Sequence, residues 1–329
     1  GKQVKATGYE EVSMVSLSTS DYTGIDELTR RLLNEMEPQK VNLALPSLRV
    51  DSFSLELMDR VRTVRKSGLT FAPEAGTQRL RDVINKNVTS EDLLRSAETA
   101  FQGGWDSIKL YFMVGLPTET LEDIRKIADL VYQVVDVWKA VTGRAVPPET
   151  AGRLPARRKL NLTVSTSCFV PKPFTPFQWE PQDCMNMLEE KQALLRSLLK
   201  DRRISYHWSD PRLSHLEAVL ARGDRRLGTV IRKAWELGCK FDSWNEHMKF
   251  QTWMEAFLFC RLDPAFYANR KREPGEILPW DHIHMGVSRS FLQKESRMAA
   301  EAKTSPHCRE ACAGCGAGRF EGGSCHVRD

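Results

Sequence analysis

The sequence SIKLYFMVGLPT, residues 107–118, contains the clearest strand in the chain and the turn that follows it. Residues 107–114 are mostly apolar, β-branched or aromatic, which is typical of a strand. Glycine and proline at Gly115 and Pro117 are the usual signals of a turn. Beyond the turn, apolar residues recur at helical spacing, at Leu121, Ile124, Ile127, Ala128 and Val131. The stretch therefore predicts one strand followed by one helix.

The same alternation runs through the first part of the chain. Strand-like runs lie at residues 12–18, 41–45, 69–72, 107–114 and 160–169, and a helical run follows each of them. Such units in succession predict parallel strands joined by right-handed crossovers. We therefore expect an α/β fold, an incomplete parallel (β/α)6 TIM-like barrel that lacks its first unit. A doubly wound open sheet fits the same pattern, and the pattern alone does not separate the two.

The pattern changes after Lys200, where helical runs follow one another without strands. Three tryptophans in this region, which we expect to pack in the core against the barrel, are Trp235, Trp244 and Trp253. We divide the chain into a barrel from its second strand onward (1–200), a mainly helical extension (201–305) and a cysteine-rich, metal-binding tail (306–329).

Composition narrows the class of protein. A net charge of +5 over 329 residues is too small by itself to indicate a nucleic-acid partner. No apolar run approaches the ~20 residues needed to span a bilayer, so we expect no membrane partner. Of eight cysteines, four are scattered in apolar or helical surroundings and four lie in the last stretch of the chain. Reduced cysteines of this kind suit a cytoplasmic location.

Polar residues and glycines stand where the predicted strands end. In parallel α/β folds ligands bind at the carboxyl ends of strands, because the loops converge there. The residues at these ends are Ser18, Ser20 and Asp21, then Ser47 and Arg49, then Glu74, then Gly115 and Pro117, then Ser165 and Ser167. One such serine alone is more often a satisfied turn hydroxyl. Together, these residues favour a site for a polar ligand with an amino acid or ribose moiety.

Several of these strand ends lie in longer motifs. They are residues 16–22 (SLSTSDY), 72–77 (APEAGT), 111–120 (YFMVGLPTET) and 169–179 (FVPKPFTPFQW). In this order and spacing they resemble the successive strand-end motifs of radical SAM enzymes. The resemblance is greatest to an uncharacterised bacterial group whose members pair the barrel with an N-terminal cobalamin-binding-like domain, and it extends into the cysteine tail.

The resemblance implies reductive cleavage of S-adenosylmethionine (SAM) at a 4Fe-4S cluster, which yields a 5′-deoxyadenosyl radical for chemistry on an unknown substrate. By position in the motifs, Ser18 and Ser20, with Asp21 beside them, would face the methionine amino group. Glu74 and Arg81 would lie near the ribose and the carboxylate. The backbone of Gly115, Leu116 and Pro117 would pack on the adenine. No catalytic residue is assigned, and cobalamin is a further cofactor that the resemblance suggests for the full-length parent.

One departure from the family concerns the cluster. The family's C-x3-C-x2-C motif belongs after the first strand, and this sequence has no cysteine before Cys168. Either the chain is the C-terminal portion of a longer protein, without the first βα unit, or the protein has lost the chemistry. We favour the first explanation, and on either one we expect the chain alone to be inactive.

The tail contains the same spacing in another place. Cys308, Cys312 and Cys315 form a C-x3-C-x2-C set, and Cys325 supplies a fourth thiol. Small residues between them let thiolates converge on one ion or cluster. Zinc and an auxiliary Fe-S cluster are both compatible with a Cys-only set, and free thiols are the remaining alternative. Because the set follows the whole barrel, we do not expect it to replace the missing cluster.

Two histidines, His207 and His215, are candidates for a catalytic or metal-binding role. His207 and His215 are each more often structural than catalytic or metal-binding in such surroundings. The leading hypothesis is thus a radical SAM enzyme of unknown substrate. The alternative is a non-catalytic binding module whose metal-bearing tail contacts RNA or a protein partner.

Overall fold

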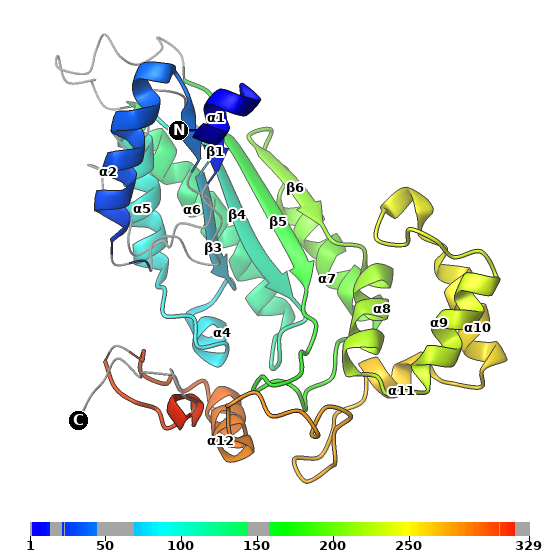
Figure 1. Ribbon diagram of the computed structural model, residues 1–329. Helices are drawn as coiled ribbons and strands as arrows, with labels where there is room; N and C mark the ends of the chain where they lie inside the picture. The colour runs from blue at the N-terminus through cyan, green and yellow to red at the C-terminus, as the bar shows by residue number, and fades with distance from the viewer. Residues whose placement is uncertain are drawn as a thin grey trace.

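The computed structural model describes residues 2–13, 22, 24–44, 69–143, 158–308 and 310–319. Its strands form two parallel sheets (Figure 1). In the smaller sheet β1 (Glu11–Ser13) pairs with β2 (Asn42–Ala44). The larger sheet has the order β3 (Leu69–Glu74), β4 (Ser107–Val114), β5 (Asn161–Cys168) and β6 (Ile204–Trp208). Four of these strands coincide closely with predicted runs, and β1 covers the described part of a fifth.

Helices follow the strands in the predicted alternation. Those of the α/β part are α1 (Lys2–Thr7), α2 (Ile25–Met36), α4 (Gln78–Val83), α5 (Ser90–Gln102), α6 (Leu121–Gly143) and α7 (Met185–Leu198). Those after β6 are α8 (Pro211–Arg222), α9 (Leu227–Glu236), α10 (Phe250–Phe259), α11 (Pro264–Ala268) and α12 (Arg289–Ala300). In the part of the chain that the structure describes, none of them combines the length and apolar character needed to cross a membrane.

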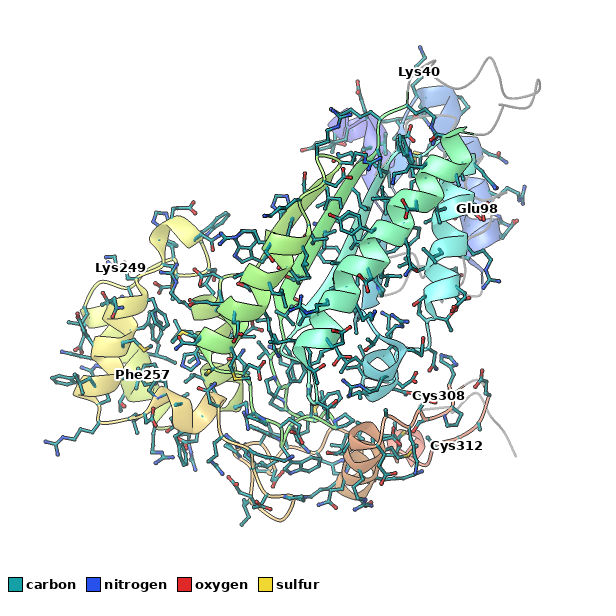
Figure 2. All side chains as sticks on the ribbon, turned by 180° about the vertical axis from the view of Figure 1, so that it is seen from behind. Lys40, Glu98, Lys249, Phe257, Cys308 and Cys312 are labelled. Carbon is teal, nitrogen blue, oxygen red and sulfur yellow. The ribbon has the colours of Figure 1, made fainter. Side chains whose placement is uncertain are left out.

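The strand order decides between the two sheet architectures. A doubly wound sheet reverses its strand order at a switch point and carries helices on both faces. Here β3 to β6 follow one another in sequence order, and α5, α6 and α7 all cover the same face (Figures 1 and 2). Successive right-handed crossovers in one direction are the winding of a parallel barrel. The described strands therefore form part of a TIM-like barrel, as the sequence predicted.

Each strand of the larger sheet has one apolar face. In β4 the side chains of Ile108, Leu110, Phe112 and Val114 are fully buried in a core with α5 and α6, and those between them are not. The neighbouring Leu162 and Val164 of β5 belong to the same core. Because side chains alternate along a strand, burial of this set in the core directs the residues between them to the opposite face of the sheet.

Two helices of this part, α4 and α5, begin at residues whose side chains accept from the first N–H groups. Thr89 and Asp92 form a reciprocal capping box at the start of α5, and Thr77 accepts a hydrogen bond from Leu80 N at the start of α4. Such caps each contribute about 1 kcal/mol to helix stability. The Thr77 cap places the beginning of α4 directly after the end of β3, where the candidate site lies.

The sheet extends beyond the predicted limit of the barrel. The sequence indicates no strand after residue 169, yet β6 pairs in parallel with β5 from Leu162↔Ile204 to Thr166↔Trp208. Ser205 and His207 make this edge strand half polar, and it is only five residues long, so its local signal is weak.

The helical extension has a core of its own. α8 to α11 pack around Leu216, Val219, Val230 and Phe257, and Trp253 joins them at 8% exposure. Trp235 and Trp244 are 61% and 62% exposed, so the prediction that they pack in the core is wrong. Trp235 lies on the face of α9 opposite its buried residues, where helical spacing directs it to solvent.

α12 and the residues that follow it pack near the carboxyl edge of the larger sheet. α12 packs against α4, and Ser305 N donates to Asn85 Oδ1 at 3.1 Å, just after α4 (Figure 1). Ala299 of α12 lies in one buried cluster with Ala75, Leu116 and Phe169, which follow β3, β4 and β5. The last helix therefore covers part of the carboxyl edge of the sheet.

The two faces of β4 predict unequal effects of neighbouring substitutions. Leu110→Ala should lower the free energy of unfolding by about 2–5 kcal/mol, because it leaves a cavity in the core. Tyr111→Ala, on the opposite face, should cost less than half as much. Urea denaturation of both variants measures the difference. Equal losses would contradict the assignment of the faces.

Candidate functional site

The carboxyl edge of β3 ends in a strained, crowded turn. Glu74 has a φ of +67°, which few non-glycine residues adopt, and Ala75 is buried. A Cβ on Gly76 would lie 2.4 Å from Ile127 N, so only glycine fits between this turn and α6. Backbone strain of this kind concentrates at functional sites, and it marks this turn as a candidate.

The Glu74 side chain remains partly accessible. Its carboxylate forms an ion pair with Lys86 Nζ at 3.2 Å, and its side chain is 23% exposed. A carboxylate at a strand end, held by a cation and still reached by solvent, can accept hydrogen bonds from a bound hydroxyl or amino group.

Arg81 lies inside the protein. Its guanidinium donates to Ala75 O at 2.9 Å and to Ser90 Oγ at 2.8 Å, and only 1% of the residue is exposed. Burial lowers the pKa of Arg81 below its ordinary value. Arg81 thus holds the turn after β3 in place by donating to the backbone of that turn. Arg79 is the arginine nearer the surface.

Asp123 joins the turns that follow β3 and β4. Its Oδ1 accepts from Thr77 Oγ1 at 2.7 Å, and its Oδ2 accepts from Thr120 Oγ1 at 2.7 Å and from Arg79 Nη2 at 2.6 Å. Burial alone would raise the pKa of Asp123, but the hydrogen bonds from Thr77, Thr120 and Arg79 hold it below the ordinary value. One carboxylate therefore fixes two neighbouring strand ends relative to each other.

Gly115 opens the turn after β4 with a φ of +83°. A Cβ there would lie 2.8 Å from Leu188 Cδ2, so the position requires glycine both by conformation and by space. Leu116 is buried in the cluster with Phe169 and Ala299, and Pro117 is half-buried. Gly115 is itself buried, and the space into which its side chain would project is filled by Leu188 and Asp183, so this turn packs closely against α7.

A buried ion cluster lies directly below this turn. Glu119 Oε2 accepts from Gly115 N at 2.7 Å and from Lys191 Nζ at 2.8 Å, and Lys191 also donates to Asp183 Oδ2 at 2.6 Å. Burial raises the pKa of Glu119. Burial would lower the pKa of Lys191, but its attraction to Glu119 and Asp183 outweighs this and raises it. The cluster ties the turn after β4 to α7.

The face of the sheet opposite the helices is polar. Strand register places Lys109, Thr163 and Ser205 in one row across β4, β5 and β6, and Tyr111, Ser165 and His207 in the next. Lys109 Nζ lies 4.4 Å from the centre of the Tyr111 ring, and it has no carboxylate partner among the described residues. Parallel sheets are normally covered on both faces, so this row of polar groups suits a polar ligand.

The sequence predicts only some residues of this polar face as site residues. Ser165 and Ser167 stood among the predicted strand ends, but Lys109 and Tyr111 did not, although the alternation of apolar and polar residues in 107–114 carried the signal. The sequence favours a structural role for His207, which lies exposed in β6. His215 is buried, and burial lowers its pKa, in keeping with a structural role.

The structure gathers some of the predicted site residues. Glu74, Gly115, Leu116 and Pro117 lie at the carboxyl ends of the adjacent strands β3 and β4. Arg81, also predicted to bind SAM, is buried and donates to Ala75 O and Ser90 Oγ instead. The other predicted SAM-binding residues, Ser18, Ser20 and Asp21, lie outside the described residues.

The tail cysteines follow α12 in the chain. Cys308 and Cys312 are exposed and Cys315 is half-buried, and all three are free thiols (Figure 2). No group of three or more His, Cys, Asp or Glu side chains that could hold a metal ion occurs within the described ranges. Cys325 lies outside those ranges. Cys168 is buried beside Gln192 and Ser209, and burial raises the pKa of its thiol, which keeps it protonated.

The buried ion cluster yields a prediction of stability. Lys191→Met should lower the free energy of unfolding by about 3–5 kcal/mol, because it leaves Glu119 buried without its cation. The loss should shrink as pH falls, since the raised pKa of Glu119 means that protonation favours the folded state at low pH. Chemical denaturation at several pH values tests this.

Two controls accompany that measurement. The double variant with Lys191→Met and Glu119→Gln should recover part of the loss, because the buried charge is then absent. Lys126→Met, at an exposed ion pair of α6, should change stability far less. A Lys191→Met variant as stable as the Lys126→Met variant would contradict the role of the cluster.

Comparison with known proteins agrees with this geometry. A model of the Radical SAM superfamily matches residues 2–131, which run from α1 into α6. An uncharacterized protein of Methanocaldococcus jannaschii is 31% identical over 228 residues, which are 69% of this chain. The chain spans 45% of the length of that relative. The glycine turns after β3 and β4 fall within the matched segment, and the chain carries a radical SAM superfamily domain over residues 2–131.

Proposed function

We propose that the carboxyl edge of β3 and β4 binds SAM and that the protein takes part in radical SAM chemistry on a polar substrate. The observation that carries this proposal is the joining of two strand-end turns, one with Glu74 and one with Gly115, through Asp123 inside the superfamily domain. Because these turns are fixed before any ligand arrives, little conformational entropy is lost on binding.

On this proposal each turn has its own part. The Glu74 carboxylate would accept hydrogen bonds from the ribose, and Lys86 would hold it in position. The backbone at Gly115 would lie against the adenine, with Leu116 and Pro117 beside it. Arg81 would act from within, through its bond to Ala75 O, rather than touch the ligand. Ser18, Ser20 and Asp21 would complete the site at the methionine end.

The polar face of the sheet would receive the substrate. Lys109, Tyr111 and His207 offer an ammonium, a phenol and an imidazole on one side of three adjacent strands. No carboxylate stands among the described residues on this face of β4, β5 and β6. Charge complementarity therefore favours a substrate with a carboxylate or phosphate group.

Radical SAM chemistry also requires a 4Fe-4S cluster. Bound and reduced, a 4Fe-4S cluster supplies the electron that cleaves SAM in this superfamily. Three cysteine thiolates would be needed for it, and the described residues do not bring three together. We therefore derive no step through the cluster from these residues. The association with a cobalamin-binding domain and cobalamin itself belong to the same proposal for the longer protein.

The SAM site is tested by titration calorimetry. The chain should bind SAM, and Glu74→Gln should weaken binding about tenfold, because a charge-assisted hydrogen bond to the ribose is lost. Glu189→Gln, at an exposed position of α7, is the matched control and should leave affinity unchanged. Wild-type protein that does not bind SAM would rule out the site.

We expect this chain to bind SAM without cleaving it. After anaerobic reconstitution with iron and sulfide, and addition of dithionite, the chain should release no 5′-deoxyadenosine, because no cysteine precedes Cys168. Liquid chromatography of the reaction mixture measures this. Formation of 5′-deoxyadenosine would show that other residues, with the tail thiols first among them, hold a catalytic cluster.

A second proposed function concerns the tail. Gly314 and Gly316 have positive φ values, which curl the chain between and beyond the thiols, and Cys315 O accepts from Ser288 N at 2.8 Å. This anchors the middle of the tail beside the start of α12. We propose that Cys308, Cys312, Cys315 and Cys325 hold zinc or an Fe-S cluster.

Metal analysis of anaerobically purified protein tests the tail. About one zinc ion or one cluster per chain is expected for a four-thiolate set, and visible absorption separates the two. Cys312→Ser should remove most of the metal. Cys184→Ser, which changes another exposed free thiol, should not. Protein with neither zinc nor iron would exclude the site.

A further inference from the structure

Two arginines are buried where the helical extension meets the loop after β5. Arg222, the last residue of α8, is 0% exposed, and Arg272 is 2% exposed. Arg222 donates to Ala268 O at 2.6 Å and to Arg270 O at 2.9 Å. Arg272 donates to Arg222 O at 2.5 Å, and its backbone N donates to Trp179 O at 2.8 Å. All of these acceptors are neutral carbonyl oxygens.

The carboxylates of this region are taken by other cations. Glu276 pairs with Arg270 at 2.7 Å, Asp224 with Arg226 at 2.7 Å, and Glu180 with Lys271 at 3.0 Å. Among the described residues neither Arg222 nor Arg272 has a carboxylate within an ion-pair distance. The two most buried cations of the region therefore have no carboxylate at ion-pair distance.

Longer-range attraction to Glu276, Glu180 and Asp224 compensates this positive charge only in part. Burial, together with Arg272 and Arg270, lowers the pKa of Arg222 to about 10, so Arg222 still carries its charge at neutral pH. Arg272 lies over the Trp280 ring, with 5.2 Å to its centre, which compensates only part of one charge. Burying charged groups without a counter-charge is strongly unfavourable.

Unused donors accompany the charge. Arg222 Nε and Arg272 Nε are buried without a hydrogen-bond partner, and so is the hydroxyl of Tyr267, which is 2% exposed. Tyr267 directly precedes Ala268, whose carbonyl accepts from Arg222, and it interacts electrostatically with Arg272. Buried donors in native proteins nearly always have partners, so three in this region indicate an acceptor that the described residues do not supply.

We propose that Arg222, Arg272 and Tyr267 bind a small oxyanion of the phosphate or sulfate class at the junction of α8, α11 and the loop after β5. A doubly charged ion would complete the partial compensation of the two guanidinium groups, and its oxygens would accept from the unused N–H and O–H donors. Because these residues are enclosed, the ion is a free inorganic anion rather than the phosphate of a large ligand. It would join the helical extension to the barrel.

The hydroxyl of Tyr267 gives a mild test. Removing a buried hydroxyl that has no partner is neutral or stabilising, whereas removing one that donates to a bound ion weakens binding. Tyr267→Phe should therefore raise the dissociation constant for inorganic phosphate roughly five- to tenfold. Tyr132→Phe, which removes a hydroxyl bonded to Leu198 O, is the matched control and should leave it unchanged.

The experiment uses the full chain after exhaustive dialysis against a buffer containing only chloride. Titration calorimetry measures phosphate and sulfate affinity, and thermal unfolding is compared in phosphate, sulfate and chloride at equal ionic strength. We expect phosphate and sulfate, but not chloride, to raise the unfolding temperature, since an ion that binds only the folded state stabilises it. Arg272→Gln should abolish this rise.

Two results would overturn the proposal. One is equal stability in all three salts together with no heat of binding. The other is a Tyr267→Phe variant that binds phosphate as well as the wild type or is more stable in every buffer. Because Tyr267→Phe retains the ring and its packing, these outcomes remain readable even where Arg272→Gln fails to fold.

Discussion

The packing of one face of β4 against α5 and α6 is the contact on which the rest of the barrel depends. Ile108, Leu110, Phe112 and Val114 are almost completely buried, and a strand cannot direct one set of side chains inward without directing the alternate set outward. The same alternation in β5 and β6 aligns polar residues across three strands. The apolar core therefore creates the polar face as a geometric consequence, and the proposed substrate surface depends on it.

At the carboxyl edge of the sheet, buried charged groups hold the strand-end turns in position. Asp123 links the turns after β3 and β4, and Glu119 with Lys191 links the second turn to α7. Such groups contribute little net stability, because desolvation offsets much of their attraction. Their value lies in geometry, since each satisfied donor permits only one arrangement of the turns. A ligand that needs Glu74 and Gly115 at fixed positions benefits from this rigidity.

The regions after the barrel are joined to it by polar contacts as well as apolar ones. α12 packs its Ala299 with Leu116 and Phe169 at the carboxyl edge, and Ser305 binds Asn85. The cysteine tail continues from Ser305, and Cys315 O accepts from Ser288 N beside the start of α12. The buried arginines Arg222 and Arg272 connect α8 with the loop after β5 in a similar way.

The sequence by itself determined the alternation of parallel strands and helices and the glycine turns at Gly76 and Gly115, because these follow from local periodicity and backbone freedom. The choice of a barrel over a doubly wound sheet depended on the observed strand order. The sequence did not reveal β6, whose short, half-polar run is stabilised only by its pairing with β5. Nor could it show that Arg81 points inward while Trp235 and Trp244 point outward. Only the tertiary structure decided these, together with the joining of turns by Asp123 and the pair of arginines without carboxylates. In each case the deciding contact lies between residues far apart in sequence, and its energy depends on burial that no local pattern records.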